Sequence, residues 1–339
     1  MKKYISITKI IKNNCLFFFL AIILLSCSKD NFNDLVESEI EKKEILLQKK
    51  IVISEMSNAS IILHKVSWPI LLHNTHICKK SKIFSYGFII AMKNDLPKSS
   101  RDAYVAIYDN WEKIDLNKTN LLPKVISVAK DSPAYKAGLL SGDEIISINN
   151  NTKLREEIYL SSSERKKLSI KIKRNQIIFN VIIDGIDICG FNVQPLASGS
   201  PNAFSDGQKI FVTIAALKLA KSNDEIAFLV GHELAHNIFH FKGKGTPESE
   251  TLPISFQDKP KYRRAYDIFM WPSLDKEVEA DIEGIRLAYN AGYDLKNAAN
   301  YWRRLSIFNP NLISDTPSMI YKGNAFRAST IESIIKKLK

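Results

Sequence analysis

The stretch LVGHELAHNIF, residues 229–239, carries two histidines four residues apart and a glutamate beside the first. Residues 222–225, SNDE, have the pattern of a capping box, which predicts that a helix begins there. On this helix His232 and His236 would share one face, one turn of about 5.4 Å apart. Two imidazoles so placed can bind one tetrahedral zinc ion, and Glu233 can face an attacking water. The alternative is an amphipathic helix with ordinary core or surface histidines.

A third metal ligand has to come from another part of the chain. His240 continues the same helix face, but a rise of 1.5 Å per residue places it about 12 Å from His232, too far for one ion. The stretch DKEVEADIEGIRLAYNAGYD, residues 275–294, places two carboxylates and two small residues on one helix face. Glu277 can coordinate zinc, and Asp281 can accept a hydrogen bond from a ligand histidine. Solvated acids on a helix are the alternative.

The first 26 residues have the features of a secretory signal, with a basic start and a short apolar run at residues 16–25. The sequence LLSC, residues 24–27, resembles a bacterial lipobox. This resemblance implies that the leader is removed and that Cys27 becomes lipidated, which anchors the chain to a membrane. Ser28 after the cysteine implies the periplasmic face of an outer membrane. A plain signal or a buried apolar helix is the alternative.

The net charge and the cysteines indicate which binding partners to expect and whether the protein works in an oxidising compartment. The net charge of +12 falls by four lysines to +8 once residues 1–26 are removed. Basic runs such as residues 164–174 lack interleaved aromatic residues, so we expect solvated faces and no nucleic-acid partner. Cys78 and Cys189 remain for an oxidising compartment, where they form either a disulfide or two buried thiols.

The 339 residues exceed a usual single domain, and their composition is typical of a globular protein. Residues 34–72 predict one or two amphipathic helices that break at Trp68-Pro69. Three further histidines lie in or near this region, but they lack ligand-like spacing with an acid, so we expect no second metal site from His64, His73 and His76.

The central region predicts a strand at residues 123–130, a short helix from Pro133, a strand, and a hairpin at 167–184 that turns at Arg174-Asn175. Its Ser-Pro-Ala, Ala-Gly-Leu and Gly-Asp landmarks within residues 131–150 resemble the core of a bacterial PDZ domain. The resemblance extends over about 101–184 and implies binding of extended peptides at a sheet edge. No Gly-Leu-Gly-Phe-like loop stands out, and a purely structural module is the alternative.

The third section predicts a strand or hairpin over residues 201–213, with a turn at Asp206-Gly207. Helices are expected at five places, near residues 213–221, 223–241, 274–291, 294–308 and 324–338. A loop rich in glycine and proline at 242–272 separates the second of these helices from the third, and it could shape or cover a cleft.

Three motifs of this section, HELAH (232–236), EVEAD (277–281) and NAFSDGQKIFVT (202–213), together resemble the HtpX and CAAX-prenyl-protease family of gluzincin metallopeptidases. Exported bacterial members that carry a PDZ module are the nearest in pattern. The resemblance implies one zinc ion on His232, His236 and Glu277, Glu233 as general base, and Asp281 as the partner of a ligand histidine. It also implies a substrate-aligning strand that includes Asn202, Ala203 and Phe204.

One feature departs from this family pattern. Many relatives carry a His-Pro dipeptide near the C-terminus, whereas this chain has Thr316-Pro317. The group that stabilises the transition state therefore stays open. Arg327 matches a basic residue often found downstream, and no catalytic role is assigned to it.

The expected fold class is α+β: a mainly helical gluzincin domain with a small sheet, plus a β-rich PDZ-like domain. The expected order is signal peptide (1–26), tether and helices packing on the peptidase (27–100), PDZ domain (101–184) and zinc metallopeptidase (185–339). The predicted function is a zinc metalloendopeptidase acting on exported or misfolded envelope proteins. The rival is a peptide-binding chaperone or assembly lipoprotein with weak or no proteolysis. Oligomeric state is not legible in the sequence.

Replacing Cys27 with alanine should release the protein from the membrane fraction, because the variant lacks the thiol that accepts the lipid. Cell fractionation followed by immunoblotting measures this. Cys15→Ala, within the part of the leader that is removed, is the control and should stay anchored. A Cys27→Ala variant that still sediments with membranes would refute the anchor.

Overall fold

A computed structural model describes the following residues: 39–108, 111–113, 121–241, 274–314 and 322–338. Three features expected from the sequence lie outside them, namely the leader with Cys27, the loop at 242–272 and the dipeptide Thr316-Pro317. The chain divides into two units, residues 1–50 and 51–339. The described chain mixes helices and sheets, consistent with the α+β class. None of its helices is long and apolar enough to cross a membrane.

The first described element is a single helix, α3 (Glu39–His73), that runs through the expected break at Trp68-Pro69. The predicted break is wrong. An interior proline costs roughly 3 kcal/mol because it removes one backbone hydrogen bond. Its neighbours Trp68 and Ile70 are only 3% and 0% exposed, and each buried side chain of this kind contributes about 1.5–3 kcal/mol. Packing therefore carries the helix past Pro69 to its end one turn later.

Five antiparallel strands form one sheet in the order β2-β3-β4-β5-β6. Their bounds are β2 (Phe88–Ala91), β3 (Lys124–Val128), β4 (Glu144–Ile148), β5 (Leu168–Arg174) and β6 (Ile177–Ile183). The sheet thus begins at Phe88, earlier than the expected boundary at 101. Alternation explains its inner face, because every second residue of β5, Leu168, Ile170 and Ile172, is fully buried.

Short helices connect these strands. Helix α4 (Pro133–Lys136) starts as predicted, with the Ser132 hydroxyl accepting a hydrogen bond from the Tyr135 backbone N–H at 3.1 Å. Helix α5 (Leu154–Ser163) was not predicted. The β5–β6 turn lies one residue later than expected, at Asn175-Gln176, where both residues have positive φ as a type I′ turn requires. Three short 3-10 helices follow β2: η1 (Lys93–Asp95), η2 (Lys98–Ile107) and η3 (Trp111–Lys113).

Two smaller sheets follow in the chain. Strand β1 (Lys82–Ser85) pairs antiparallel with β7 (Ile186–Cys189). The other sheet has the order β8-β10-β9, from β8 (Asn192–Leu196), β9 (Ala203–Ser205) and β10 (Lys209–Thr213). Strand β10 runs parallel to β8 and antiparallel to β9. The predicted hairpin with its turn at Asp206-Gly207 is therefore present, and β9 lies at a sheet edge.

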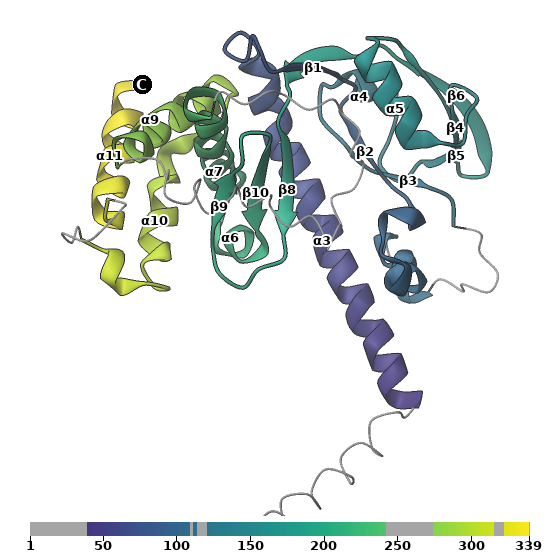
Figure 1. The fold of residues 1–339 in the computed structure, drawn as a ribbon, viewed down its shortest axis with the longest axis horizontal. Coiled ribbons are helices and arrows are strands. Elements are labelled where there is room, and N and C mark those ends of the chain that lie inside the picture. Colours follow the sequence, from purple (N-terminus) through teal and green to yellow (C-terminus); the bar gives the residue numbers. More distant parts are fainter. Residues whose placement is uncertain (1–38, 109–110, 114–120, 242–273, 315–321, 339) are drawn as a thin grey trace, which may run out of the picture. The chain divides into compact units, whose positions relative to one another are not determined.

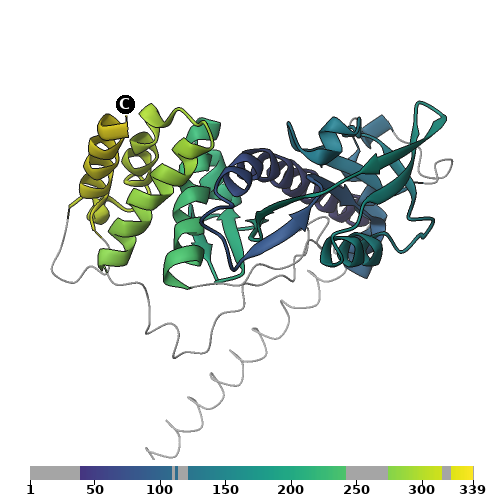
Figure 2. The same ribbon diagram turned by 90° about the horizontal axis from the view of Figure 1, so that it is seen from above.

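The C-terminal section is mainly helical, close to the predicted ranges. Its elements are α6 (Ile214–Leu219), α7 (Asn223–Ala235), the π-helical turn η4 (His236–His240), α9 (Leu274–Asn290), η5 (Leu295–Asn297), α10 (Ala299–Leu305), η6 (Pro310–Leu312) and α11 (Asn324–Leu338). Figures 1 and 2 both show α7, α9, α10 and α11 gathered beside the three-stranded sheet. Among the described residues, their apolar side chains form the larger of two buried cores together with those of α3, β7, β8 and β10. The five-stranded sheet and the short helices α4 and α5 form the other core.

A disulfide joins Cys78, which follows α3, to Cys189 at the end of β7. Of the two alternatives that the sequence left open, the structure has the disulfide. Both residues are buried, with exposures of 2% and 0%. The bond ties two segments 111 residues apart in the sequence, so it restricts the unfolded chain strongly.

Helices α7 and α9 touch backbone to backbone at two glycines. A Cβ atom added to Gly231 would lie 2.4 Å from the Gly284 carbonyl oxygen, and one added to Gly284 would lie 2.5 Å from the His232 nitrogen. No side chain larger than hydrogen fits at either position without moving a backbone. This contact brings the residues on α9 next to the histidines on α7.

Gly284→Ala should separate α7 from α9 and destabilise the protein by about 1–3 kcal/mol, the usual range for overpacking. Alanine has the better helix propensity by about 1 kcal/mol, so a measured loss would understate the steric cost. Urea unfolding followed by circular dichroism measures the change in free energy. Gly199→Ala is the control, since nothing lies within 4 Å of its added Cβ. Equal stability of the two variants would contradict the close contact.

Candidate metal centre

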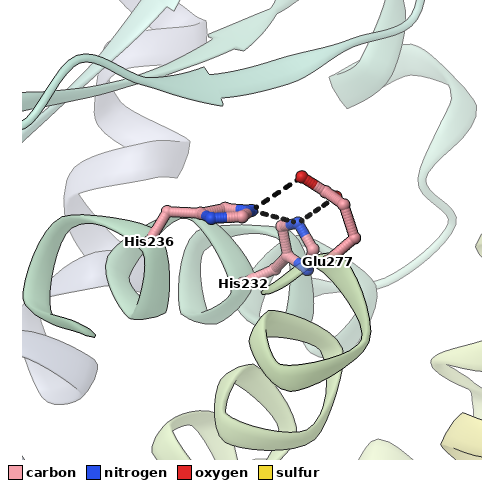
Figure 3. A group of neighbouring side chains, drawn as sticks. All are labelled: His232, His236 and Glu277. Carbon is pink, nitrogen blue, oxygen red and sulfur yellow. Dashed lines mark hydrogen bonds and ion pairs between the residues drawn. The ribbon is translucent and has the colours of Figure 1, made fainter. Parts of the chain in front are cut away.

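His232, His236 and Glu277 converge on one point between α7, η4 and α9, as Figure 3 shows. The two histidine Nε2 atoms lie 3.1 Å apart. The Glu277 carboxylate oxygens lie 3.3 Å from the Nε2 of His236 and 3.5 Å from that of His232. All three side chains are buried, with at most 8% exposed. The helices thus bring together residues more than forty positions apart.

This donor set fits a small divalent cation. Two ligands of a tetrahedral zinc ion, each roughly 2.0–2.1 Å from the metal, lie about 3.3 Å from one another. At this centre the two nitrogens lie 3.1 Å apart, and each lies 3.3 or 3.5 Å from a different oxygen of the Glu277 carboxylate. Two imidazole nitrogens and one carboxylate oxygen are also the donors that zinc prefers. The residues present can therefore hold a zinc ion without a change of fold.

Asp281 and Arg327 hold the first histidine from behind. The Nδ1 of His232 lies 2.9 Å from the Asp281 carboxylate. Arg327 on α11 donates two hydrogen bonds to the same carboxylate, at 2.6 and 2.7 Å, and its guanidinium lies 3.7 Å from the centre of the Trp302 ring. This arrangement fixes the ring so that Nε2 points at the metal position. The sequence assigned no role to Arg327, and only α11 packing against α9 reveals one.

The buried charges shift the pKa values of these groups. Burial alone would lower the pKa of His232, but its hydrogen bonds to Asp281 and Glu277 outweigh burial and raise the pKa to about 9. Burial would raise the pKa of Glu277, but hydrogen bonds from the two histidines hold the pKa well below its usual range. The pKa of Asp281 is lowered despite its burial, mainly by Arg327. An incoming metal ion must therefore compete with a proton on His232.

Glu233 lies between the metal position and the edge strand β9. Its side chain is 7% exposed, and one carboxylate oxygen is 4.0 Å from the Nε2 of His232. The other accepts a hydrogen bond from the Ser205 hydroxyl at 3.0 Å. Ser205 was not among the expected site residues, although it directly follows the expected strand residues. Its hydroxyl fixes the direction of the Glu233 carboxylate.

The expected substrate strand is β9, together with the residue before it. The Asn202 N–H donates to the Thr213 hydroxyl at 2.9 Å. Ala203 pairs with Val212, and the Phe204 ring stacks on Phe211 with centroids 5.1 Å apart. These contacts lie on the β10 side, so the opposite edge of β9 has no partner strand within the described chain.

Asn237, directly after the second histidine, ties the histidine helix to the β9–β10 turn. Its side-chain oxygen accepts a hydrogen bond from the Gly207 N–H at 2.8 Å, and its nitrogen donates to the Lys209 carbonyl at 3.2 Å. Asn237 is fully buried. Sequence reasoning missed this residue, because nothing in the sequence pairs it with a turn thirty residues earlier.

The remaining histidines are not grouped with the metal ligands. His240 lies behind His236, with their Nδ1 atoms 2.9 Å apart. His64 bonds to the Ser127 hydroxyl at 2.8 Å, and burial lowers its pKa to about 4. His73 and His76 are exposed. Within the described residues the one group suited to a metal ion is His232, His236 and Glu277.

A loop that sequence reasoning missed precedes the edge strand β2. Ser85 and Tyr86 are buried, and Gly87 has φ +80 and a Cβ position that would overlap Ser132. Glycine is therefore required at this turn, just before Phe88 begins the strand. Residues 85–88 read Ser-Tyr-Gly-Phe. They did not stand out in the sequence because a serine occupies the place of the first glycine of the Gly-Leu-Gly-Phe pattern.

Asp281→Asn should weaken zinc binding and destabilise the fold by about 3–5 kcal/mol, because the buried Arg327 loses its closest counter-ion and keeps only Glu277, at 3.9 Å. Urea unfolding followed by the fluorescence of the tryptophans, which include Trp302 beside Arg327, measures the loss. Glu332→Gln is the control, since Glu332 pairs with Arg303 at the surface and such pairs are worth about 1 kcal/mol or less. Equal losses in both variants would show that the buried pair contributes little.

Two comparisons with known families agree with this geometry. Residues 178–240 match the family model of Peptidase family M48, a match that spans β9, His232, Glu233 and His236. Residues 124–174 match the model of the PDZ domain, from the start of β3 to the end of β5. No curated protein matches the chain. Together the two matches show that the chain contains a segment similar to M48-family metallopeptidases and, before it, a segment similar to PDZ domains.

Proposed function

We propose that the protein is a zinc-dependent endopeptidase that cleaves extended segments of other proteins. The observation that carries this proposal is the convergence of three buried ligand atoms beside the carboxylate of Glu233 and the edge of β9 that has no partner strand among the described residues. His232, His236 and Glu277 would hold the ion. When bound, zinc would supply Lewis-acid chemistry that activates a water molecule and polarises the scissile carbonyl.

Glu233 is placed to move the proton in this reaction. Its carboxylate borders the metal position and is almost fully shielded from solvent. It would take a proton from the attacking water and pass it to the nitrogen of the leaving amine, so that no charged amide is released. The hydrogen bond from Ser205 keeps the carboxylate directed between the strand and the metal position.

Strand β9 supports a role in substrate alignment. Its outer edge can pair with an extended peptide through main-chain hydrogen bonds, which bind many sequences because they do not depend on side chains. The strand also contributes Ser205, which contacts the general base. A peptide added at this edge would run past Glu233, and this supports an endopeptidase acting on unfolded or extended segments.

The PDZ domain and the expected anchor complete the proposal. The five-stranded sheet has two edges, β2 and β6, and an extended peptide could add to such an edge as a further strand. With lipidation of Cys27, the protein would act on exported or misfolded envelope proteins at the periplasmic face of an outer membrane. The proposed division is a PDZ domain from Phe88 to Ile183 and a peptidase domain from residue 185 onward.

Glu233→Gln should retain zinc but lower kcat by about 10²- to 10⁴-fold, the usual contribution of a general acid–base group. The amide keeps the size of the side chain but cannot accept the proton. Metal content by mass spectrometry and cleavage of casein by the full chain measure the two effects. Glu55→Gln is the control, since Glu55 is about half exposed and pairs with Lys218. Wild-type cleavage by Glu233→Gln would rule out this mechanism.

His232→Ala separates the enzyme from a peptide-binding chaperone. This variant should lose both zinc and casein cleavage, because one of three ligands is missing. The chaperone is favoured by a different outcome: the wild type binds zinc and suppresses aggregation of an unfolded protein without cleaving it, and His232→Ala suppresses aggregation equally well.

A further inference from the structure

The histidine helix and α9 meet through three residue pairs, although only two of the three histidines are candidate ligands. Each histidine of α7 and η4 has a carboxylate of α9 as its nearest acidic partner: His232 has Asp281, His236 has Glu277, and His240 has Glu279. The third pair lies outside the metal ligands. His240 is only 6% exposed in its side chain, whereas Glu279 is 55% exposed. A buried imidazole with a surface carboxylate therefore borders the metal centre.

His240 contacts the second ligand histidine directly. Its Nδ1 lies 2.9 Å from the Nδ1 of His236, and its Nε2 lies 3.0 Å from the Glu279 carboxylate. The two rings are 5.0 Å apart between centroids. The π-helical turn sets this placement, since the Phe241 N–H donates to the His236 carbonyl at 2.8 Å, five residues back. Such π turns are frequent at functional sites.

Only one arrangement of protons satisfies these contacts when His236 binds a metal ion. The Nε2 of His236 faces the other ligands, so it must offer a lone pair and its single proton lies on Nδ1. That N–H then donates to the Nδ1 of His240, which must be unprotonated. The proton of His240 lies on Nε2 and donates to Glu279. Each donor in the chain thus meets an acceptor, ending at a solvated carboxylate.

We propose that His240 and Glu279 are positioning residues that fix the tautomer and ring orientation of His236 for zinc binding. The proposal rests on the proposed function, because it concerns the same zinc ion. It gives the second ligand what Asp281 gives the first. The two supports differ in strength: Asp281 is a buried anion backed by Arg327, whereas His240 is a neutral ring whose carboxylate is partly in water. His236 is therefore the more weakly fixed ligand.

The test is the zinc dissociation constant of the full chain, measured by competition with a chromogenic chelator. His240→Leu should weaken zinc binding about 10- to 100-fold, the usual effect of removing the partner of a ligand histidine. His240→Gln should recover most of the affinity, since its amide oxygen can accept from His236 and its nitrogen can donate to Glu279. Glu279→Ala should cause a smaller loss, because its carboxylate is about half exposed.

Two controls separate positioning from general damage. His73→Leu removes an exposed histidine far along the sequence from the ligands. Glu283→Ala removes a carboxylate of α9 that pairs with Arg286. Both variants should bind zinc as the wild type does. Glu279→Ala should cause no further loss of zinc affinity in the His240→Leu background, because Glu279 acts on His236 only through its hydrogen bond with His240. Long-range proton–nitrogen spectra of the zinc-loaded protein should show His236 protonated on Nδ1 and His240 protonated on Nε2.

The outcomes distinguish this proposal from the proposed function. If the wild type binds no zinc, the proposed function fails. If the wild type binds zinc and both His240→Leu and Glu279→Ala bind it equally tightly, the positioning role fails while the enzyme stands. If His240→Leu does not fold, Glu279→Ala decides, since Glu279 lies at the surface. Additive losses in the double variant, or no recovery in His240→Gln, would also overturn the chain of hydrogen bonds.

Discussion

The close contact of α7 with α9 is the constraint on which the metal centre depends. At Gly231 and Gly284 the two helix backbones approach so closely that a Cβ atom on either would lie within 2.5 Å of the other helix. Only at this separation can the Glu277 carboxylate reach both imidazoles. The small residues cost helix propensity, about 1 kcal/mol for each glycine. The chain accepts that cost because a bulkier contact would move the carboxylate out of range.

The charges around the centre are arranged so that each buried ion has a partner. Asp281 lies between His232 and Arg327, and the Arg327 guanidinium lies over the Trp302 ring. Removing a charged group from water costs several kcal/mol, which only close pairing and hydrogen bonds offset. The same network that makes α11 pack against α9 therefore also orients the first ligand. The same few side chains therefore contribute both to stability and to the proposed metal site, which would link folding of the C-terminal helices to metal binding.

The three-stranded sheet beside the helices fixes strand β9 relative to Glu233. Strand β9 is held by β10 on one side, and Asn237 ties the following turn to the end of the histidine helix. Ser205 joins the strand to Glu233. The proposed substrate edge and the proposed base are thus fixed to one another through short hydrogen bonds rather than through a flexible loop. Catalysis benefits from such preorganisation, because the reacting groups need no rearrangement before the chemical step.

Local patterns in the sequence determined the helix with its two histidines, the carboxylate face of α9, the β9–β10 hairpin and the PDZ-like strands, because these follow from spacing and turn chemistry over a few residues. Tertiary structure alone decided the rest. Packing carried α3 through Pro69, placed Arg327 behind Asp281, set Ser205 against Glu233, and placed Glu279 beside His240. The contacts of Arg327, Ser205 and Glu279 join residues that are distant in the sequence, so no local periodicity encodes them.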